Sequence, residues 1–291
     1  KGGVSASTGM RTYSLEEAKA AAERIGYPVV VKRVDSSGSR GITVVEQPER
    51  MEEAYRHAAK RSTRDYVLVE GFIKGTEIGV DGFVQDGQLV FMAPHTKFVY
   101  KGKNTTIPVG HAFPYQCSQE VYDEIGKQMQ AAVTASGADR CSVNADVFVD
   151  GNKVSIIEMG GRTGATCIPE LISIYYGFDF YEKMLRSALG ETVEFNCTGK
   201  QPCMAKLLLS PVEGKISHID IEGIRRLEEK GVVVSLDFPV GHKVFAMADG
   251  TDRIGHIIAR TEEESQLDAW MMEAYRCICI DGVSLEDIWK R

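Results

Sequence analysis

The sequence predicts an α+β fold with more than one lobe, and three observations lead to this prediction. Short valine- and isoleucine-rich runs alternate with alanine-rich segments of helical spacing, as in residues 14–26 and 29–31. Asp-Gly turns separate several of the runs, which is typical of antiparallel hairpins. The chain of 291 residues is also long enough for two or three domains with substantial cores.

The bulk composition is that of an ordinary globular protein and argues against several classes of function. Hydrophobic residues make up 43% of the chain and charged residues 26%. The formal net charge is −7 and no long basic stretch offsets it, which argues against a nucleic-acid binder. No apolar run approaches the length of a membrane span, and the N-terminus has no signal-peptide hydrophobic core. We therefore expect neither a nucleic acid nor a membrane as a partner.

The cysteines and histidines indicate neither a disulfide framework nor a zinc site. The seven cysteines and six histidines are scattered, and the sequence has no Cys-x-x-Cys and no paired-histidine motif. Reduced thiols are the simplest explanation of an odd, dispersed set of cysteines, and they predict a cytoplasmic protein.

Residues 1–65 are expected to form a small α/β lobe. A capping box from Ser14 to Glu17 begins a helix that ends at Gly26. The predicted elements that follow are a buried strand at 29–31 with Lys32 at its end, a Ser/Gly-rich loop at 35–41, a strand at 42–45 and a helix at 48–61.

Residues 66–198 are expected to form a larger lobe, and residues 199–291 a separate strand-rich cap. The larger lobe is predicted to have strands at 66–70, 77–84 and 88–92, a helix from about 119 to 137, a β-hairpin around 150–152 and a helix at 181–189. Residues 95–116 show no clear period and contain Lys97 and His111, so we interpret them as a long functional loop. The cap is predicted to have strands at 204–209, 231–234, 242–247 and 255–259, and a helix at 262–278.

Asp146 and Glu158 are the most informative residues, because they lie in two alternating strands joined by a tight turn. Side chains alternate between the faces of a strand, so the length of the turn decides whether the carboxylates meet. A three-residue turn pairs Asn144 with Glu158 and puts all three side chains on one face, within reach of one hard cation. A two-residue turn puts the carboxylates on opposite faces. Two solvated acids are the simpler interpretation, but the apolar run before Glu158 and the glycine-rich turn after it favour a functional site.

A second candidate site begins where Lys32 precedes the loop Ser36-Ser37-Gly38-Ser39-Arg40-Gly41. Glycines let the backbone N–H groups approach phosphate oxygens closely, and a lysine supplies a compact positive charge beside them. The segment matches neither a Walker A loop nor a Rossmann fingerprint, because a strand follows the glycines. Taken alone, it is better explained as a hairpin turn beside a surface lysine.

The order of the motifs changes that interpretation. Lys32, the Ser/Gly-rich loop, Glu70-Gly71-Phe72-Ile73, Glu77, Asp146, Glu158 and Arg162 follow one another in an order that resembles the ATP-grasp superfamily, in particular its carboxylate–amine ligases. The resemblance covers residues 1 to about 260, and it is specific as an ordered set although each motif alone is weak. It implies an ATP-grasp fold, in which two α+β lobes hold ATP between them, followed here by a strand-rich C-terminal cap.

The resemblance implies a nucleotide site. Lys32 would contact the ATP phosphates, and a mobile glycine-rich flap would contain Ser37, Gly38, Ser39 and Gly41. Glu70, Gly71, Phe72 and Ile73 would present backbone groups to adenine, and Glu77 would bind the ribose hydroxyls. An interior strand followed by a surface Glu77 is the structural alternative.

The resemblance also implies a metal site. Asp146 and Glu158 match the ligands of Mg²⁺, for which Mn²⁺ would be a substitute. The family usually has asparagine where this sequence has Gly160, so a usual ligand of a second metal is missing. We hypothesise that Asn144 partly replaces it; otherwise one Mg²⁺ is held weakly, mainly by ATP.

The substrate site is implied around Arg162, which matches the arginine that grips the substrate carboxylate or the transferred phosphoryl group. A salt bridge to Asp146 or Glu158 is the structural alternative for Arg162. Thr163, Gly164 and Thr166 would line the same pocket. For His111, as for Lys97, contact with the substrate and a plain surface position are equally weighted.

The implied function is an ATP-dependent ligase that joins a small-molecule carboxylate to an amine through an acyl phosphate, with Lys32 and Arg162 as catalytic residues. Three alternatives stay open: a carboxylase, a purine-pathway ligase, and a nucleotide-binding module that no longer turns over. Such ligases normally begin with another α/β domain, so we expect that an N-terminal domain is missing from this sequence. A homodimer is compatible with the resemblance.

Overall fold

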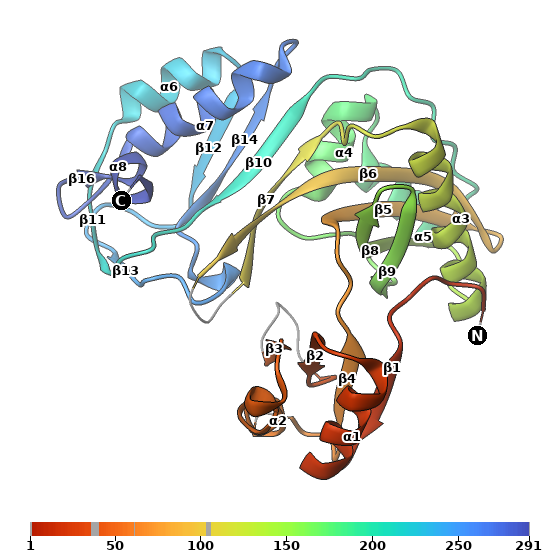
Figure 1. Ribbon diagram of the computed structural model, residues 1–291. Coiled ribbons are helices and arrows are strands. Elements are labelled where there is room, and N and C mark those ends of the chain that lie inside the picture. The colour runs from red at the N-terminus through yellow and green to blue at the C-terminus, as the bar shows by residue number, and fades with distance from the viewer. Residues whose placement is uncertain (1, 36–40, 61, 103–105, 291) are drawn as a thin grey trace.

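The computed structural model describes residues 2–35, 41–60, 62–102 and 106–290, which form two lobes and a cap (Figure 1). The expected α+β class is confirmed, because helices and antiparallel strands occur in all three parts. In Figure 1 the small lobe lies at the bottom, the large sheet above it and the cap at the upper left.

The small lobe is a four-stranded antiparallel sheet, with strand order β1-β4-β2-β3, covered by two helices on one face. Its elements are β1 (Gly9–Thr12), α1 (Leu15–Ile25), β2 (Val29–Lys32), β3 (Ile42–Val45), a 3-10 turn (Pro48–Arg50), α2 (Met51–Ala59) and β4 (Val67–Gly71). The hydroxyl of Ser14 accepts a hydrogen bond from the Glu17 N–H at 3.1 Å, so α1 begins at the cap that the sequence predicts. Fully buried Ala18 and Ala22 of α1 pack against Val31, which leaves the other face of the sheet to the interlobe side.

The boundary between the two lobes lies later than the sequence led us to expect. β4 pairs with both β1 and β2, so it belongs to the small lobe, whereas the expected boundary at residue 65 assigned it to the large lobe. A strand's sheet depends on long-range pairing, which local sequence does not encode. Residues 72–75 connect the lobes instead. Gly75 suits this connection, because its φ is +136° and a β-carbon there would collide with the carbonyl of Val149.

An eight-stranded sheet, with order β12-β14-β10-β7-β6-β5-β8-β9, runs through the rest of the molecule. Its large-lobe strands are β5 (Thr76–Gln85), β6 (Gln88–Lys101), β7 (Thr106–Phe113), β8 (Cys141–Asp150) and β9 (Lys153–Gly160). β6 and β7 pair with each other, so the expected functional loop over residues 95–116 was wrong. Polar side chains such as His95 and Lys97 interrupt the alternation of apolar residues along these strands, so the sequence pattern did not reveal them.

Helices cover both faces of the large sheet. α3 (Gln119–Ser136) packs on one face, against residues that include Val80, Ala145 and Val147. α4 (Ile168–Tyr176) and α5 (Phe180–Ala188) cover part of the other face through a cluster of aromatic and aliphatic side chains. The sequence analysis did not predict α4.

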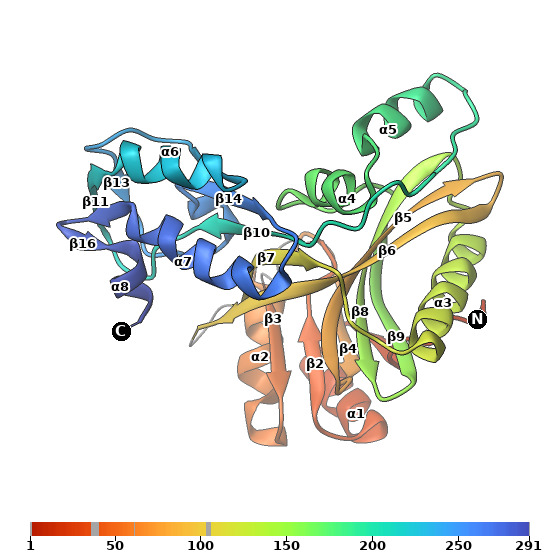
Figure 2. The same ribbon diagram turned by 90° about the horizontal axis from the view of Figure 1, so that it is seen from above.

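Three strands of the C-terminal region continue the large sheet, so the expected separate cap was wrong in this respect. β10 (Cys203–Leu208) pairs with β7, β14 (Gly255–Arg260) pairs with β10, and β12 (Val232–Leu236) pairs with β14. Figure 2 shows this continuity, with β7, β10 and β14 running from the large lobe into the cap. The remaining elements are β11 (Gly214–Ile219), α6 (Ile221–Glu229), β13 (Lys243–Val244), α7 (Leu267–Arg276), β15 (Ile278–Ile280), β16 (Val283–Ser284), α8 (Leu285–Trp289) and 3-10 turns at Gly250–Asp252 and Glu264–Gln266.

None of the helices in the described ranges combines the length and the hydropathy that a bilayer crossing requires. All seven cysteines are free thiols in the structure.

Candidate active site

The turn of the β8–β9 hairpin differs from the one that would bring Asp146 and Glu158 together in a regular ladder. Asp150 pairs with Lys153, so the turn contains only residues 151–152. The expected pairing of Asn144 with Glu158 through a three-residue turn was therefore wrong. With an uninterrupted ladder, this two-residue turn would put the two carboxylates on opposite faces.

A β-bulge brings the carboxylates back to one face. Val147 pairs with Ile156, but the preceding residue Asp146 pairs with Glu158, so Ile157 is an extra residue in β9. Residues directly opposite each other in an antiparallel pair point to the same side of the sheet. Asp146 and Glu158 are therefore direct cross-strand neighbours.

The two carboxylates lie on the face of the sheet opposite α3. Ala145 and Val147, on either side of Asp146, are fully buried in the cluster under α3. Because strand residues alternate, Asp146 points the other way. We call this side of the sheet, which also carries Glu77 and Asp81 of β5, the site face.

Lys97 of β6 places a buried cation on the site face. Its Nζ lies 2.7 Å from Glu77 Oε1 and 2.7 Å from Asp146 Oδ1, and only 7% of its side chain is exposed. Burial alone would lower the pKa of Lys97, but the charges of Asp146 and Glu77 and the hydrogen bonds to them outweigh burial and raise it. Lys97 is therefore charged at neutral pH and neutralises part of an acidic cluster.

The free face of the small-lobe sheet offers an apolar surface that also carries an ion pair. Lys32 Nζ lies 2.7 Å from Glu70 Oε2, and both side chains are largely buried. Ile42 and Val44 of β3 lie on the same face and are exposed, although they are large and apolar. Exposed apolar side chains beside a lysine are what a flat ring with attached phosphates would cover.

The segment that connects the lobes borders a cavity. The N–H of Gly71 donates to the Thr8 carbonyl at 3.0 Å, and the N–H of Phe72 donates to the Pro28 carbonyl at 3.1 Å, so both are already engaged. A cavity of about 130 Å³ lies between this segment and the β8–β9 hairpin, lined by Phe72, Ile73, Lys74, Phe148, Asp150, Lys153 and Ser155. A wider groove of about 600 Å³ adjoins it and is lined in part by Ser5, Ser7, Thr8 and Arg24.

The predicted flap is described only at its ends. Ser37, Gly38 and Ser39 lie outside the described residues. Gly41, at the start of the return strand, has a φ of +77°, a conformation that favours glycine. At the other end, the carboxylate of Asp35 accepts hydrogen bonds from the Thr63 N–H and hydroxyl and from the Ser62 hydroxyl.

Arg162 lies in an exposed turn directly after β9. Its Nη1 donates a hydrogen bond to the carbonyl of Thr163 at 2.7 Å. In the described part of the chain it forms no ion pair, so the alternative of a salt bridge to Asp146 or Glu158 is not what the structure has.

The residues after Arg162 form a constrained approach to α4. The Thr163 hydroxyl and the Gly164 N–H both donate to Asp81 Oδ1, at 3.3 and 2.7 Å. Thr166 and Cys167 have φ values of 58° and 63°, a left-handed conformation that costs about 1–3 kcal/mol for each non-glycine residue. The turn is therefore held in a conformation that the chain would not adopt alone.

Asn144 lies beside Asp146 on the site face but binds a different partner. Its Nδ2 donates to Asp81 Oδ2 at 2.8 Å, and His95 Nε2 donates to the same oxygen at 3.1 Å. The hypothesis that Asn144 is a metal ligand therefore stays a prediction, and it requires its side-chain oxygen to reach the cation while its nitrogen stays on Asp81.

His111 lies on β7 next to Lys97 and is only 7% exposed. Burial is the main cause that lowers the pKa of His111 well below its usual value, and the electrostatic influence of His95 and Lys97 acts in the same direction. His111 is therefore a neutral imidazole beneath the site face, and its role in substrate binding stays a prediction.

The donor set of the site face suits a hard divalent cation. Asp146 and Glu158 offer carboxylate oxygens from adjacent strands, and Glu77 offers a third nearby. Across the described residues, no three histidine, cysteine or acidic side chains already surround one point. Mg²⁺ usually binds one or two carboxylates together with substrate phosphates, so two ligands on one face fit it.

Several residues of this site were missed or misplaced by the sequence analysis. Lys97 was assigned to a loop, and Asp81 and His95 were not singled out. The sequence does carry a signal for Asp81, because Glu77, Gly79 and Asp81 alternate with apolar residues along β5.

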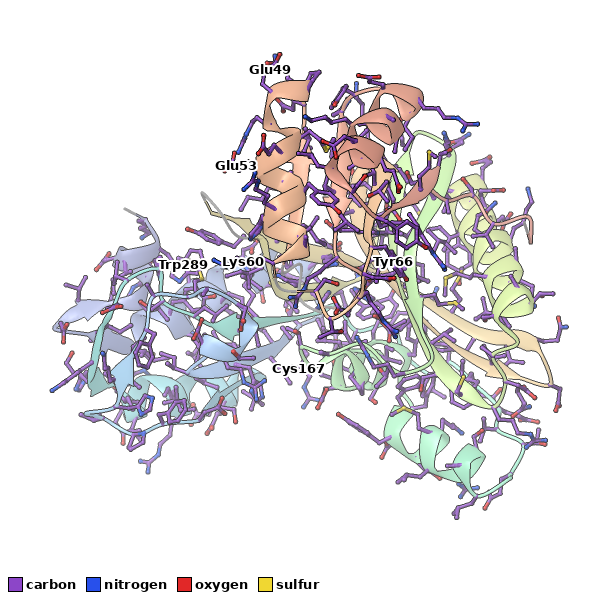
Figure 3. The ribbon with its side chains drawn as sticks, turned by 90° about the horizontal axis from the view of Figure 1, so that it is seen from below. Glu49, Glu53, Lys60, Tyr66, Cys167 and Trp289 are labelled. Carbon is purple, nitrogen blue, oxygen red and sulfur yellow. The ribbon has the colours of Figure 1, made fainter. Side chains whose placement is uncertain are left out.

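Arg253 of the cap acts electrostatically on the turn before α4. Its charge acts on the thiol of Cys167, whose pKa is raised to about 11 chiefly by burial, with a raising contribution from Glu170 and a lowering one from Arg253. Arg253 therefore lies near the turn before α4, and it forms an ion pair with Asp237 at 3.0 Å. Figure 3 shows Cys167 in the middle of the molecule, with the cap on one side and the large lobe on the other.

Comparison with known proteins identifies relatives that share this organisation. A family model described as an ATP-grasp domain matches residues 25–170. The sequence is 33% identical over 178 residues to a D-alanine–D-alanine ligase from Halorhodospira halophila, which covers 59% of this chain and 57% of that protein. It is 31% identical over 163 residues to a carbamoyl phosphate synthase large chain from Clostridium acetobutylicum, which covers 54% of this chain and 15% of that protein.

A third relative matches along more of the chain. The sequence is 29% identical over 283 residues to a formate-dependent phosphoribosylglycinamide formyltransferase from a Synechococcus species, which covers 91% of this chain and 65% of that protein. The chain thus spans less than two thirds of the length of each of these curated relatives.

Two solved structures share the fold along nearly the whole chain. A phosphoribosylglycinamide synthetase from Anaerococcus prevotii superposes with a TM-score of 0.75 at 25% identity, covering 96% of this chain and 70% of that one. An L-amino acid ligase from Bacillus licheniformis superposes with a TM-score of 0.78 at 20% identity, covering 96% of this chain and 68% of that one.

Proposed function

Since the chain belongs to the ATP-grasp family, we propose that it is an ATP-dependent ligase that joins a small-molecule carboxylate to an amine through an acyl phosphate. The observation that carries this proposal is the site face, where Asp146 and Glu158 are direct cross-strand neighbours and Lys97 lies against Asp146. A buried lysine among acids suits a reaction in which negative charge moves between bound groups.

The nucleotide would lie between the small-lobe sheet and the site face. Lys32 would release Glu70 to bind a phosphate, and the loop Ser37–Gly41 would close over it. The adenine ring would enter the cavity beside Gly71–Ile73, where the N–H of Ile73 is the proposed donor because those of Gly71 and Phe72 are already bonded within the protein. Glu77 would bind the ribose hydroxyls.

Mg²⁺, with Mn²⁺ as a substitute, would be held by Asp146 and Glu158, with Asn144 proposed as a further ligand. When bound there, the cation would neutralise phosphate charge that the lysines alone leave uncompensated. Lys97 would then exchange its contact with Asp146 for one with a phosphate oxygen.

In the first step, Arg162 would hold the substrate carboxylate in line with the terminal phosphate, because a guanidinium binds two oxygens at once. A carboxylate oxygen forms a bond to the γ-phosphorus while the bond from that phosphorus to the β–γ bridging oxygen breaks, which yields an acyl phosphate and ADP. Lys32 and Lys97 would counter the charge on the transferred group.

In the second step, the nitrogen of a neutral amine attacks the acyl carbon. The bond from that carbon to the phosphate oxygen breaks, phosphate leaves and the new amide nitrogen loses its extra proton to solvent. Exclusion of water by the flap protects the acyl phosphate from hydrolysis during this step.

Phosphate release tests the proposal directly. The chain is incubated with MgATP and pooled L-amino acids, and released phosphate is measured against reactions that lack amino acids. We expect release that depends on the amino acids and is abolished in Glu158→Ala. Glu124→Ala removes a partly exposed acid of α3, far from the site face, and is the matched control that should behave like the parent chain. Nucleotide binding with no turnover under any substrate set would instead support an inert module.

A second candidate is a purine-type ligation, in which a phosphorylated ribosylamine is the amine. The match over 91% of the chain to a phosphoribosylglycinamide formyltransferase favours it. The same assay distinguishes the two, with formate, glycine or bicarbonate as the acid and a phosphoribosylated amine as the acceptor.

A homodimer and a cytoplasmic location remain proposals. One solved relative is described as a biotin carboxylase domain dimer, which supports testing this chain for self-association. Sedimentation velocity at several protein concentrations would detect it.

A further inference from the structure

Asp81 is a fully buried carboxylate at the centre of a polar network, and the proposed reaction steps give Asp81 itself no role. Removing a carboxylate from water costs several kcal/mol, so such a group is kept only where hydrogen bonds compensate for the loss. Asp81 accepts four, from His95 Nε2, Asn144 Nδ2, the Thr163 hydroxyl and the Gly164 N–H.

The two oxygens of Asp81 have different partners. Oδ2 accepts from His95 at 3.1 Å and from Asn144 at 2.8 Å, and both donors stand on strands of the large sheet. Oδ1 accepts from Thr163 at 3.3 Å and from Gly164 at 2.7 Å, and both donors stand on the turn after β9. One carboxylate therefore ties the turn to three strands of the sheet.

The residues around His95 fix the position of its ring beside Asp81. His95 is opposite Gly79, and a β-carbon at residue 79 would overlap the imidazole ring. The ring also packs edge-to-face on neutral His111, with 4.7 Å between the ring centres, and is 1% exposed. His95 is thus held where its Nε2 meets Asp81.

Arg162 depends on this turn for its position. Its guanidinium bonds to the carbonyl of Thr163, whose own hydroxyl bonds to Asp81. Gly164 fits tightly beneath, since a β-carbon there would lie 3.0 Å from both Asp81 and Asn144. A displacement of the Asp81 side chain would therefore move Arg162 through Thr163 and Gly164.

We propose that Asp81 is a positioning residue that orients Arg162 through Thr163 and Gly164. This inference rests on the proposed function for its catalytic consequence. Its structural consequence, an ordered turn at Arg162, can be tested without any activity.

Three variants separate the roles of the network. Asp81→Asn keeps the shape of the side chain but has one oxygen for two pairs of donors. Asp81→Ala removes both carboxylate oxygens. Thr163→Val removes one donor at a half-buried position and leaves the carboxylate in place, so it serves if the Asp81 variants fold poorly. Asp139→Asn is the matched control, because Asp139 also accepts a loop N–H, that of Gly87 at 3.0 Å, but at a hairpin turn outside this network.

The kinetic arm uses the phosphate-release assay. A displacement of the order of 1 Å in a group that holds substrate lowers the rate by about 10- to 100-fold. We expect a loss of that size in the kcat of the folded fraction for Asp81→Asn, with the KM for ATP close to that of the parent chain and of Asp139→Asn, whether or not the melting temperature falls. A purely structural role would instead lower the melting temperature and leave the kcat of the folded fraction unchanged, and that result would overturn the proposal.

The second arm measures order at the turn by trypsin cleavage after Arg162, followed by mass spectrometry under native conditions. We expect cleavage at this bond to be several-fold faster in Asp81→Asn and Thr163→Val than in the parent chain and in Asp139→Asn. Equal cleavage rates in all four proteins would overturn the proposal. Failure of the proposed function appears differently, as a parent chain that releases no phosphate while its Arg162 bond still resists trypsin.

Discussion

At the scale of single residues, the site is arranged around Lys97. Its ammonium lies between Glu77 and Asp146, two acids for which the family resemblance implies different roles, ribose and metal binding. An internal cation at this place keeps the carboxylates close together before any ligand arrives. A metal ion at the proposed site would therefore compete with Lys97 for Asp146.

Lys97→Met is expected to change metal binding and turnover in opposite directions. Without the ammonium, Asp146 is free for a cation, so the affinity of the protein for Mn²⁺ without nucleotide should rise. ATP-dependent phosphate release should fall by about 100-fold or more, as when one preorganised charge-stabilising group is removed. Titration of bound Mn²⁺ by electron paramagnetic resonance measures the first effect and the release assay the second.

Lys127→Met is the control for Lys97→Met, because Lys127 is an exposed lysine of α3 with one acidic partner. It should alter neither quantity. Weaker Mn²⁺ binding in Lys97→Met would contradict the competition between Lys97 and the cation.

Gly160→Asn is expected to strengthen metal binding at the proposed site. Residue 160 is opposite Asn144 on the site face, and a β-carbon there would lie no closer than 3.7 Å to its nearest neighbour, so a side chain fits. An asparagine oxygen beside Glu158 would add a hard ligand. We expect half-maximal phosphate release at a Mg²⁺ concentration about 3- to 10-fold lower, the gain of roughly 1 kcal/mol typical of one hydrogen-bond-sized interaction.

Gly161→Asn, the same substitution one residue later in the chain, is the control for Gly160→Asn. Gly161→Asn also has open space, but residue 161 lies beyond the end of β9. It should leave the Mg²⁺ requirement unchanged. An equal effect of the two substitutions would show that neither acts as a ligand.

At the scale of elements, irregular backbone creates the site. With the two-residue turn alone, Asp146 and Glu158 would point to opposite faces of the sheet, and the bulge at Ile157 puts them on the same face. Thr166 and Cys167 take left-handed conformations before α4, and the hydrogen bonds of the preceding turn to Asp81 hold them there. At the small lobe, Asp35 ties the base of the flap to the loop before β4.

The carboxylate of Asp35 predicts a pH dependence of stability. Hydrogen bonds from the Thr63 side chain and backbone, together with one from Ser62, lower its pKa to about 2. A carboxyl whose pKa is lowered by folding stabilises the protein above its unfolded pKa of about 3.9, and this contribution disappears as the pH falls through the folded pKa. Asp35→Asn should therefore be less stable than the parent chain above pH 4, with the difference shrinking toward pH 2.

Urea unfolding of both proteins across this pH range measures the difference. Asp65→Asn, which removes an exposed acid from the loop that contains Ser62 and Thr63, controls for the loss of one negative charge. A stability difference between Asp35→Asn and the parent that is as large at pH 2 as at pH 6 would exclude the Asp35 carboxylate as its source.

At the scale of the whole molecule, one sheet joins the large lobe to the cap. β10 contributes Cys203 and Ala205 to the aromatic cluster under α4, and Ile258 of β14 packs against it. The small lobe, by contrast, has its own sheet and core and joins the rest through residues 72–75 and the N-terminal segment. Motion of the small lobe against a rigid body made of the large lobe and cap is therefore what this architecture permits.

A chain truncated after residue 200 is expected not to fold. It would lose β10, β14 and β12, which would expose the edge of β7 and open the cluster around Phe113. Circular dichroism and size-exclusion chromatography of residues 1–200 should show aggregation and no cooperative thermal transition. A soluble truncated chain with a sharp transition would mean that the cap is an independent unit after all.

Local pattern predicted the small-lobe elements well, because α1, β2 and β3 each carry their own signals of capping or alternation. It failed for β6 and β7, whose site-face side chains are polar although largely buried. It also failed for the β8–β9 hairpin, because neither the length of its turn nor the position of its bulge can be read from the composition of the segment. Lys32, Asp146 and Glu158 could be named from motif order, but the hydrogen-bond network of Asp81 could not be predicted, because its partners come from positions 95, 144, 163 and 164.

The sequence by itself determined the α+β class, the family and the identity of the two facing carboxylates, because these depend on local periodicity and on the order of motifs along the chain. Only the tertiary structure decided that a bulge puts those carboxylates on one face, that Lys97 lies between Asp146 and Glu77, and that the cap continues the large sheet. The physical reason is that strand register and the burial of charge arise from contacts between residues far apart in the chain, which no local pattern records.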